Sequence, residues 1–260
     1  MANEDIQQAY TDAVFRNLRK FAKWEPGQSC NLGDYGTLEG TYFDYWGNLE
    51  DKGIDPKKLV KVEEKDDMEP DGSYVFTTAG EKGIGSAVVV NTPIAKASFD
   101  VSFSAENAIQ IHAIDAVYEK YENLEFLEKE LQRLEKTGEW DRKKFVVVGS
   151  VMKTGPAIVL MSTSGGSKVE IEATSKDPKI PLPTQLTAIL KSLQLGVELK
   201  VNQKQGSVYA KTCPNLSTSM RLYAIKGFIF SHKLQAVDPL VRIQSFAVEA
   251  KDNLVEIVPS

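Results

Sequence analysis

The pattern of apolar and polar positions predicts strands along most of the chain. The clearest example is residues 97–104, Ala-Ser-Phe-Asp-Val-Ser-Phe-Ser, in which apolar and polar side chains alternate strictly. In extended backbone, successive side chains point to opposite faces of the strand. One face of this strand therefore carries Ala97, Phe99, Val101 and Phe103. The same alternation suits a strand half-buried on a soluble core and a strand that lies between lipid and water.

Further strand patterns cover much of the remaining sequence. We expect strands at 87–90, 108–114, 145–152, 157–163, 168–173, 197–203, 207–212, 221–231 and 241–258. The pair Gly165-Gly166 is typical of the tight turn of a β-hairpin. Residues 25–60 are rich in Gly, Asp and aromatic side chains, which predicts short strands joined by tight turns. The acidic stretch 63–73 is expected to be an exposed loop.

Two segments show the spacing of an amphipathic helix, and a third, shorter helix is expected at 184–195. Residues 4–24 repeat apolar side chains every three or four positions until Pro26-Gly27 ends the pattern. Residues 117–137 combine acidic faces with one apolar stripe, namely Val117, Tyr121, Leu124, Leu131 and Leu134. We therefore expect a single strand-rich α+β domain over residues 1–260, with a largely antiparallel twisted sheet, an N-terminal amphipathic helix and a long acidic-faced helix.

Composition narrows the classes of function. A chain of 260 residues with 42% hydrophobic and 26% charged residues is ordinary for a soluble globular protein. The formal net charge of -5 argues against a nucleic-acid partner. The N-terminus has no pattern of a secretory signal, and no run of apolar residues is long enough for a spanning helix. The two cysteines, Cys30 and Cys213, provide no disulfide framework and suit a reducing cytoplasm.

Candidate catalytic residues are scarce. His112 and His232 are the only histidines, and neither has the spacing of metal ligands or lies beside a nucleophile motif. The alternation around His112 predicts that its side chain lies on an exposed strand face. We therefore expect no catalytic residue, no metal and no cofactor, and the chain is not expected to be an enzyme.

Two clusters of basic residues are candidates for contact with a membrane surface. The first has the spacing of one helical face and consists of Arg16, Arg19, Lys20 and Lys23. The second precedes the apolar run 145–148 and consists of Arg142, Lys143 and Lys144. Each basic residue near an anionic bilayer contributes about 1 kcal/mol to binding. The alternatives are a solvated helix end whose cations suit the helix dipole, and charged residues that keep a sticky strand soluble.

Two regions are long enough for strands that cross a bilayer, which need about 9 to 11 residues each. These are residues 84–114 and 145–175; in the second, Val169 and Ile171 alternate with charged side chains. A half-buried sheet of a soluble domain is the other interpretation of both regions, and the alternation alone favours it.

The order of these elements resembles the N-terminal pore-forming domain of gasdermins. The most similar stretch is 142–199, which runs from Arg-Lys-Lys-Phe-Val-Val-Val through Ile-Pro-Leu-Pro to the apolar segment beyond it. Residues 91–101, Asn-Thr-Pro-Ile-Ala-Lys-Ala-Ser-Phe-Asp-Val, are similar to the first insertion hairpin of that family. A short chain without a C-terminal repressor domain is most like the fungal regulator-of-cell-death homologues.

The resemblance implies a pore-forming effector of regulated cell death. Such domains bind acidic phospholipids of the inner leaflet, oligomerise, and extend two amphipathic hairpins per subunit into a transmembrane β-barrel. By position, the lipid-binding residues would be Arg16, Arg19, Lys20, Lys23, Arg142, Lys143 and Lys144. The membrane-inserting residues would be Ala97, Phe99, Val101, Phe103, Val169 and Ile171.

The fungal homologues also imply a trigger, because in them allelic variants that meet after cell fusion cause death (heterokaryon incompatibility). We therefore expect a homo-oligomer, or a hetero-oligomer with an allelic partner. The chain would be cytoplasmic when inactive and at the plasma membrane, or another membrane that contains cardiolipin or phosphoinositides, when active. The alternative is a soluble cytosolic binding or scaffold module with no membrane activity.

Overall fold

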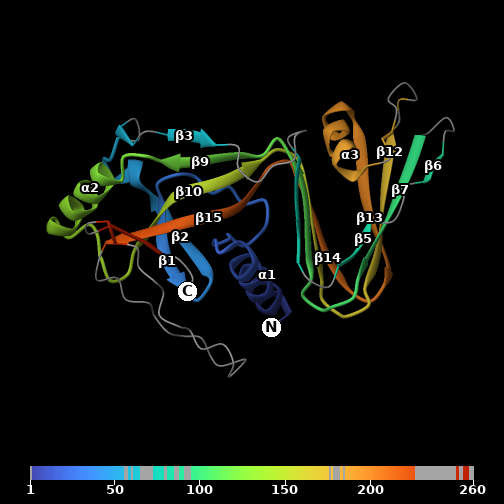
Figure 1. The fold of residues 1–260 in the computed structure, drawn as a ribbon, viewed down its shortest axis with the longest axis horizontal. Coiled ribbons are helices and arrows are strands. Elements are labelled where there is room, and N and C mark those ends of the chain that lie inside the picture. Colours follow the sequence, from blue (N-terminus) through green and yellow to red (C-terminus); the bar gives the residue numbers. More distant parts are fainter. Residues whose placement is uncertain are drawn as a thin grey trace. The chain divides into compact units, whose positions relative to one another are not determined.

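The chain forms a strand-rich α+β structure with antiparallel sheets and few helices (Figure 1). The computed structural model describes residues 2–55, 58–59, 61–64, 73–78, 81–84, 88–90, 95–175, 177, 182–183, 185–225, 250–251 and 254–257. Two compact units divide the chain. The first unit comprises residues 1–13, 66–116 and 154–216, and the second comprises 14–65, 117–153 and 217–260.

The first unit contains two antiparallel sheets that share one apolar core. One sheet has the order β14 (Val208–Cys213), β11 (Ala157–Ser162), β8 (Ile109–Ile114) and β4 (Ser73–Thr77). The other has the order β13 (Val197–Gln205), β12 (Lys168–Ser175), β7 (Ala95–Phe103) and β5 (Glu81–Ile84), and β6 (Val88–Val90) also pairs with β7. Helix α3 (Leu186–Ser192) adds buried leucine and isoleucine side chains to the same core.

The second unit is built on an eight-stranded sheet. Its main order is β16 (Ala250–Lys251), β17 (Leu254–Ile257), β15 (Leu216–Ile225), β10 (Val146–Thr154), β1 (Asp34–Glu39) and β2 (Tyr42–Asn48), and β9 (Val117–Tyr121) pairs with both β10 and β3 (Lys61–Glu64). Val147 packs with Leu127 and Leu131 of helix α2 (Leu124–Lys136), whereas Val146 and Val148 belong to a separate apolar cluster. Apolar groups therefore cover both faces of β10, which explains its continuous apolar run.

Both long helices are shorter than their sequence patterns predict. Helix α1 (Ala2–Leu18) ends six residues before the predicted end at 24, and Arg19 has a positive φ of 54°. The prediction that a helix begins at 117 is wrong, because residues Val117–Tyr121 form strand β9. Asn123 then caps α2 by accepting a hydrogen bond from the Phe126 N–H at 3.0 Å. The apolar side chains of β9 continue the helical spacing of the apolar residues of α2. The predicted helix was therefore extended over residues that form a strand.

Two further predictions are wrong for reasons of sheet pairing. Gly165-Gly166 is a turn but not the turn of a hairpin, because β11 and β12 on either side of it belong to different sheets. His112 is only 5% exposed, because the sheet face that carries it points into the core of the first unit beside Ile158. Strands at 146–154, 157–162, 168–175, 197–205 and 208–213 confirm the predicted strand positions.

Some predictions fall partly outside the described residues. The predicted strands at 221–231 and 241–258 are described only to 225 and at 250–251 and 254–257, where β15, β16 and β17 lie. Of the predicted acidic loop, residues 65–72 are not described, and Glu63 and Glu64 are the end of β3. None of the helices in the described parts of the chain is both long and apolar enough to cross a membrane.

Candidate functional site

The first basic cluster does not lie on one helical face. Arg16 is in the last turn of α1, but Arg19 and the residues after it lie beyond the helix end. The chain leaves the helix because Phe21 is buried and exchanges two backbone hydrogen bonds with Met220, at 2.9 and 2.8 Å. Arg16 and Arg19 remain exposed to solvent. The predicted helical spacing of the four residues is therefore wrong, whereas their contact with lipid stays a prediction.

The other two cations of this cluster contact aromatic rings of the second unit. The Nζ of Lys20 lies 4.7 Å from the centroid of the Tyr118 ring. The Nζ of Lys23 lies 4.5 Å from the centroid of the Tyr45 ring and donates a hydrogen bond to the Ser29 carbonyl at 3.0 Å. A cation over the face of a ring is attracted by the ring quadrupole. These contacts fix both lysines beside the sheet.

The second basic cluster divides into three different environments. Arg142 forms an ion pair with Glu135, which lowers the pKa of that carboxyl below its ordinary value. Lys143 is exposed. Lys144 places its Nζ 3.8 Å from the centroid of the Trp46 ring. Arg142 is thus neutralised by Glu135, whereas Lys143 is exposed to solvent and Lys144 lies over an exposed aromatic ring.

Strand β2 brings members of both basic clusters to adjacent residues. Lys23 covers Tyr45 and Lys144 covers Trp46, and these two rings are 45% and 51% exposed. The register of β2 against β1 shifts between Tyr35 and Gly36, so Trp46 is the extra residue of a β-bulge. The bulge leaves consecutive aromatic residues exposed. We call Lys23, Tyr45, Trp46 and Lys144 the β2 cation–aromatic set.

The candidate inserting residues all lie in the core of the first unit. Ala97, Phe99, Val101, Phe103, Val169 and Ile171 are each at most 1% exposed. Strands β7 and β12 pair in antiparallel register, with Phe99 opposite Ile171 and Val101 opposite Val169. The predicted alternation along residues 97–104 and 168–173 is therefore confirmed as an apolar inward face. Whether this face ever contacts lipid stays a prediction.

The outward face of the same strand pair is charged. Asp100 lies opposite Glu170, and Ser98 lies opposite Glu172. Lys204 of β13 forms an ion pair with Glu170 at 2.7 Å, and Lys96 forms one with Glu172 at 3.2 Å. The inward face of β7 is thus apolar, that of β12 is apolar apart from the buried Ser175 at its end, and the outward face of the pair is polar and carries ion pairs.

The two predicted hairpin regions differ in their pairing. Within residues 84–114, β6 pairs with β7 as an antiparallel neighbour. Within residues 145–175, by contrast, β10, β11 and β12 belong to three different sheets. The chain changes sheet at Gly155-Pro156 and again at Gly165-Gly166, so this region is not a hairpin in the present structure.

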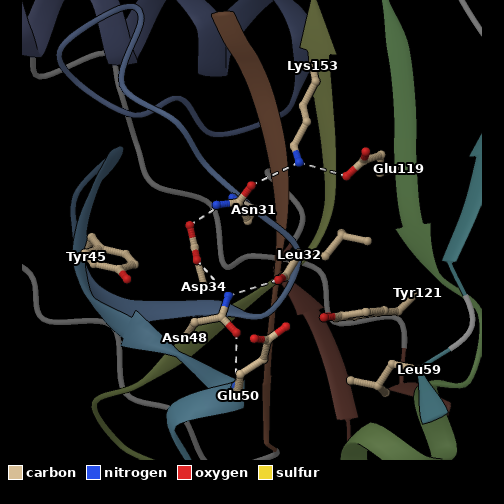
Figure 2. A pocket seen from close by; sticks show the side chains of 10 residues that line it. All are labelled: Asn31, Leu32, Asp34, Tyr45, Asn48, Glu50, Leu59, Glu119, Tyr121 and Lys153. Atoms are coloured by element: carbon tan, nitrogen blue, oxygen red, sulfur yellow. Dashed lines mark hydrogen bonds and ion pairs between the residues drawn. The ribbon is translucent and has the colours of Figure 1, made fainter. Parts of the chain in front are cut away.

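A pocket of about 460 Å³ in the second unit was not predicted from the sequence (Figure 2). Ten residues line it, namely Asn31, Leu32, Asp34, Tyr45, Asn48, Glu50, Leu59, Glu119, Tyr121 and Lys153. They come from the segment before β1, from β1 and β2 and the residues that follow, and from β9 and β10. Only the sheet pairing brings these segments together, so no local sequence motif indicated the pocket.

Hydrogen bonds organise one wall of the pocket. The buried Asp34 accepts from the Asn31 backbone N–H at 2.8 Å and from the Asn48 side-chain amide at 2.9 Å. Lys153 donates to the Asn31 side-chain oxygen and pairs with Glu119, both at 3.0 Å (Figure 2). Burial and the nearby Asp34 raise the pKa of the Cys30 thiol to about 12, so this cysteine is not a thiolate nucleophile.

The remaining candidate metal ligands and histidines do not form a site in the described part of the chain. Among the described residues, no group of three or more His, Cys, Asp and Glu side chains is arranged to hold a metal ion. His232 lies outside the described residues. Comparison with models of protein families and with curated proteins found no match to this chain.

Proposed function

We propose that this protein is a gasdermin-like pore-forming effector of regulated cell death. In this proposal it binds acidic phospholipids, oligomerises, and inserts amphipathic β-hairpins from the regions 84–114 and 145–175. The observation that carries the proposal is the pair β7–β12, which has one apolar face of core residues and one charge-paired polar face. Strands that separate lipid from water need this division.

The length of strand β7 supports the proposal, whereas β12 is slightly shorter than a spanning strand. Strand β7 has nine residues and β12 has eight. A tilted strand that crosses the hydrocarbon layer needs about 9 to 11 residues. Insertion would exchange the core side chains that now cover the apolar face, Ile158, Leu160 and Ile189 among them, for lipid chains. The charged face would remain in water on the side of the pore.

Membrane docking is assigned to exposed cations and to the β2 cation–aromatic set. Arg16, Arg19 and Lys143 are exposed cations of the second unit. Trp46 and Tyr45 are amphipathic rings of the type that is enriched at membrane–water interfaces. The cations would attract anionic headgroups, and the rings would enter the interface. Docking would precede any change in the first unit.

Dye release from liposomes tests the proposal. The purified protein, alone and mixed with a candidate allelic partner, is added to vesicles that contain cardiolipin or phosphoinositide and to phosphatidylcholine vesicles. We expect dye release from the vesicles that contain cardiolipin or phosphoinositide and no release from the phosphatidylcholine vesicles. The double variant Arg16→Glu, Arg19→Glu should sediment at least tenfold less with acidic vesicles, because each cation contributes about 1 kcal/mol.

The matched control for this variant is Lys136→Glu with Lys191→Glu, which reverses two exposed cations outside the docking residues and the inserting strands. It should bind nearly as well as the wild type. Absence of release under every pairing, together with absence of rings by electron microscopy, contradicts pore formation. Equal loss of binding by both double variants contradicts the assignment of the docking surface.

A soluble binding or scaffold module is the second candidate, and complete burial of Phe99, Val101 and Ile171 in the first unit favours it. Under that function the amphipathic strands serve only as core. It predicts a monomer that does not sediment with acidic vesicles at any salt concentration.

A further inference from the structure

The pocket of the second unit carries an excess of negative charge that the proposed pore function does not use. Asp34, Glu50 and Glu119 line it, and Lys153 is the one cation among its ten lining residues. The ammonium of Lys153 is engaged by Glu119 and Asn31. The remaining carboxylates leave a negative field in a partly enclosed space, where charges interact more strongly than in bulk water. A phosphate or carboxylate ligand would be repelled.

Tyr121 is the second, independent feature of the pocket. Its side chain is only 6% exposed, and Figure 2 shows its hydroxyl directed into the pocket with no hydrogen bond drawn to it. No described residue supplies a hydrogen-bond partner for this hydroxyl. The hydroxyl is not one of the fully buried polar atoms that lack a partner, so its oxygen is accessible from the pocket. It is therefore available to a polar ligand that enters the pocket.

Space for a ligand atom beside this hydroxyl depends on a glycine. A Cβ at Gly33 would lie 2.8 Å from the Tyr121 hydroxyl oxygen, and the φ of Gly33 is +81°. Any other residue would close this side of the pocket and strain the backbone. Burial and, to a smaller extent, the nearby carboxylates raise the pKa of Tyr121, so the hydroxyl stays protonated.

Two more residues indicate what kind of ligand fits. Glu50 is exposed at the pocket rim, and its carboxylate has no partner among the described residues. Its backbone N–H is bound to the Asn48 side chain at 3.0 Å, which fixes the position of the residue. Leu32 and Leu59 add apolar lining. Carboxylate, hydroxyl and apolar groups together suit an ammonium ion on methylene groups.

We propose that this pocket binds a primary alkylammonium group on a short aliphatic chain. The ammonium donates hydrogen bonds to the Glu50 carboxylate and the Tyr121 hydroxyl, and the methylene groups pack against Leu32 and Leu59. Free linear polyamines carry this chemistry, and so does the ethanolamine headgroup of a phospholipid. Tyr45 belongs both to the pocket lining and to the β2 cation–aromatic set, but binding of an ammonium group does not depend on the pore formation proposed above.

Isothermal titration calorimetry without lipid tests the pocket directly. Spermidine and ethanolamine are titrated into the wild-type protein and into Glu50→Gln and Tyr121→Phe. A carboxylate–ammonium hydrogen bond is worth a factor of about ten in affinity, so Glu50→Gln should weaken binding about tenfold. Tyr121→Phe should weaken it several-fold without lowering Tm, because the hydroxyl has no intramolecular partner. The matched control, Glu122→Gln, changes an exposed carboxylate outside the pocket and should bind like the wild type.

A second arm separates the two sources of the ammonium group. Sedimentation with vesicles of phosphatidylethanolamine and phosphatidylcholine is compared with vesicles of phosphatidylcholine alone. If the wild type binds spermidine and Glu50→Gln binds it about tenfold more weakly, the ligand is a free polyamine. If the wild type binds only the ethanolamine vesicles and Glu50→Gln binds them about tenfold more weakly, the ligand is the headgroup. Absence of both, equal affinity of all variants, or displacement of spermidine by millimolar Ca²⁺ at constant ionic strength overturns the proposal.

Discussion

His112 is a titratable residue buried in an apolar environment. It is buried on β8, it faces Val75 and Ile158 across the neighbouring strands, and neither ring nitrogen has a hydrogen-bond partner among the described residues. Burial lowers the pKa of His112 to about 4. A histidine held neutral in this way makes the stability of the first unit depend on pH.

The sign of this dependence follows from the two pKa values. In the unfolded chain His112 takes up a proton near its ordinary pKa of 6.5, whereas in the folded chain it stays neutral down to about 4. Its contribution is therefore complete above pH 6.5 and is lost as the pH falls from 6.5 toward 4. The total loss is about 3 kcal/mol. Urea unfolding of the wild type and of His112→Leu at pH 7.5, 6.5, 5.5 and 4.5 measures it. As the pH falls, the free energy of unfolding of the wild type should decrease relative to that of His112→Leu. A difference between the two proteins that is independent of pH contradicts the assignment.

Helix α2 depends on one capping residue for its start. The Asn123 side chain accepts the hydrogen bond of the Phe126 N–H, and the buried Leu127, Leu131 and Leu134 then face the sheet. Without the cap, a donor at the first turn would lose its partner. This local signal, rather than the apolar spacing, decides that the helix begins after Tyr121.

Asn123→Ala should therefore lower the free energy of unfolding by about 1 kcal/mol. Asn123→Ser keeps a side-chain oxygen for the Phe126 N–H and should lose clearly less. Chemical denaturation of both variants, with circular dichroism as readout, gives the comparison. Equal losses for Ala and Ser would mean that the capping hydrogen bond does not stabilise α2.

The sequence reveals local features of this molecule better than its long-range pairing. The alternation of Phe99 and Val101 with polar neighbours is a local property, so it identified both the strand and its buried face. The partner of a strand depends on turns and on distant residues instead. The change of sheet at Gly165-Gly166 was therefore missed.

The pocket was missed for the same reason. Asp34, Glu119 and Lys153 are unremarkable in their own segments and meet only through the pairing of β9 with β10 and of β10 with β1. No spacing rule predicts such a meeting. The cation–aromatic contacts on β2 likewise required the structure, because Lys23 and Lys144 belong to separate basic clusters.

At the scale of the whole molecule, the central claim is that the apolar face of β7 leaves the core and contacts lipid. Val101 lies on that apolar face, and its neighbour Asp100 lies on the polar face. The most direct measurement attaches a fluorophore to Val101→Cys or to Asp100→Cys, in a chain whose Cys30 and Cys213 are replaced by Ala. Acidic vesicles with and without a nitroxide quencher on the acyl chains are then compared, alone and after partner mixing.

The proposed function predicts that the acyl-chain quencher dims the label at residue 101 and leaves the label at residue 100 bright, under the conditions that release dye. The protein core contains no quencher, so burial in the first unit gives no such difference. Equal fluorescence with and without quencher at residue 101, in vesicles that have bound the protein, would contradict the claim that these strands enter a membrane.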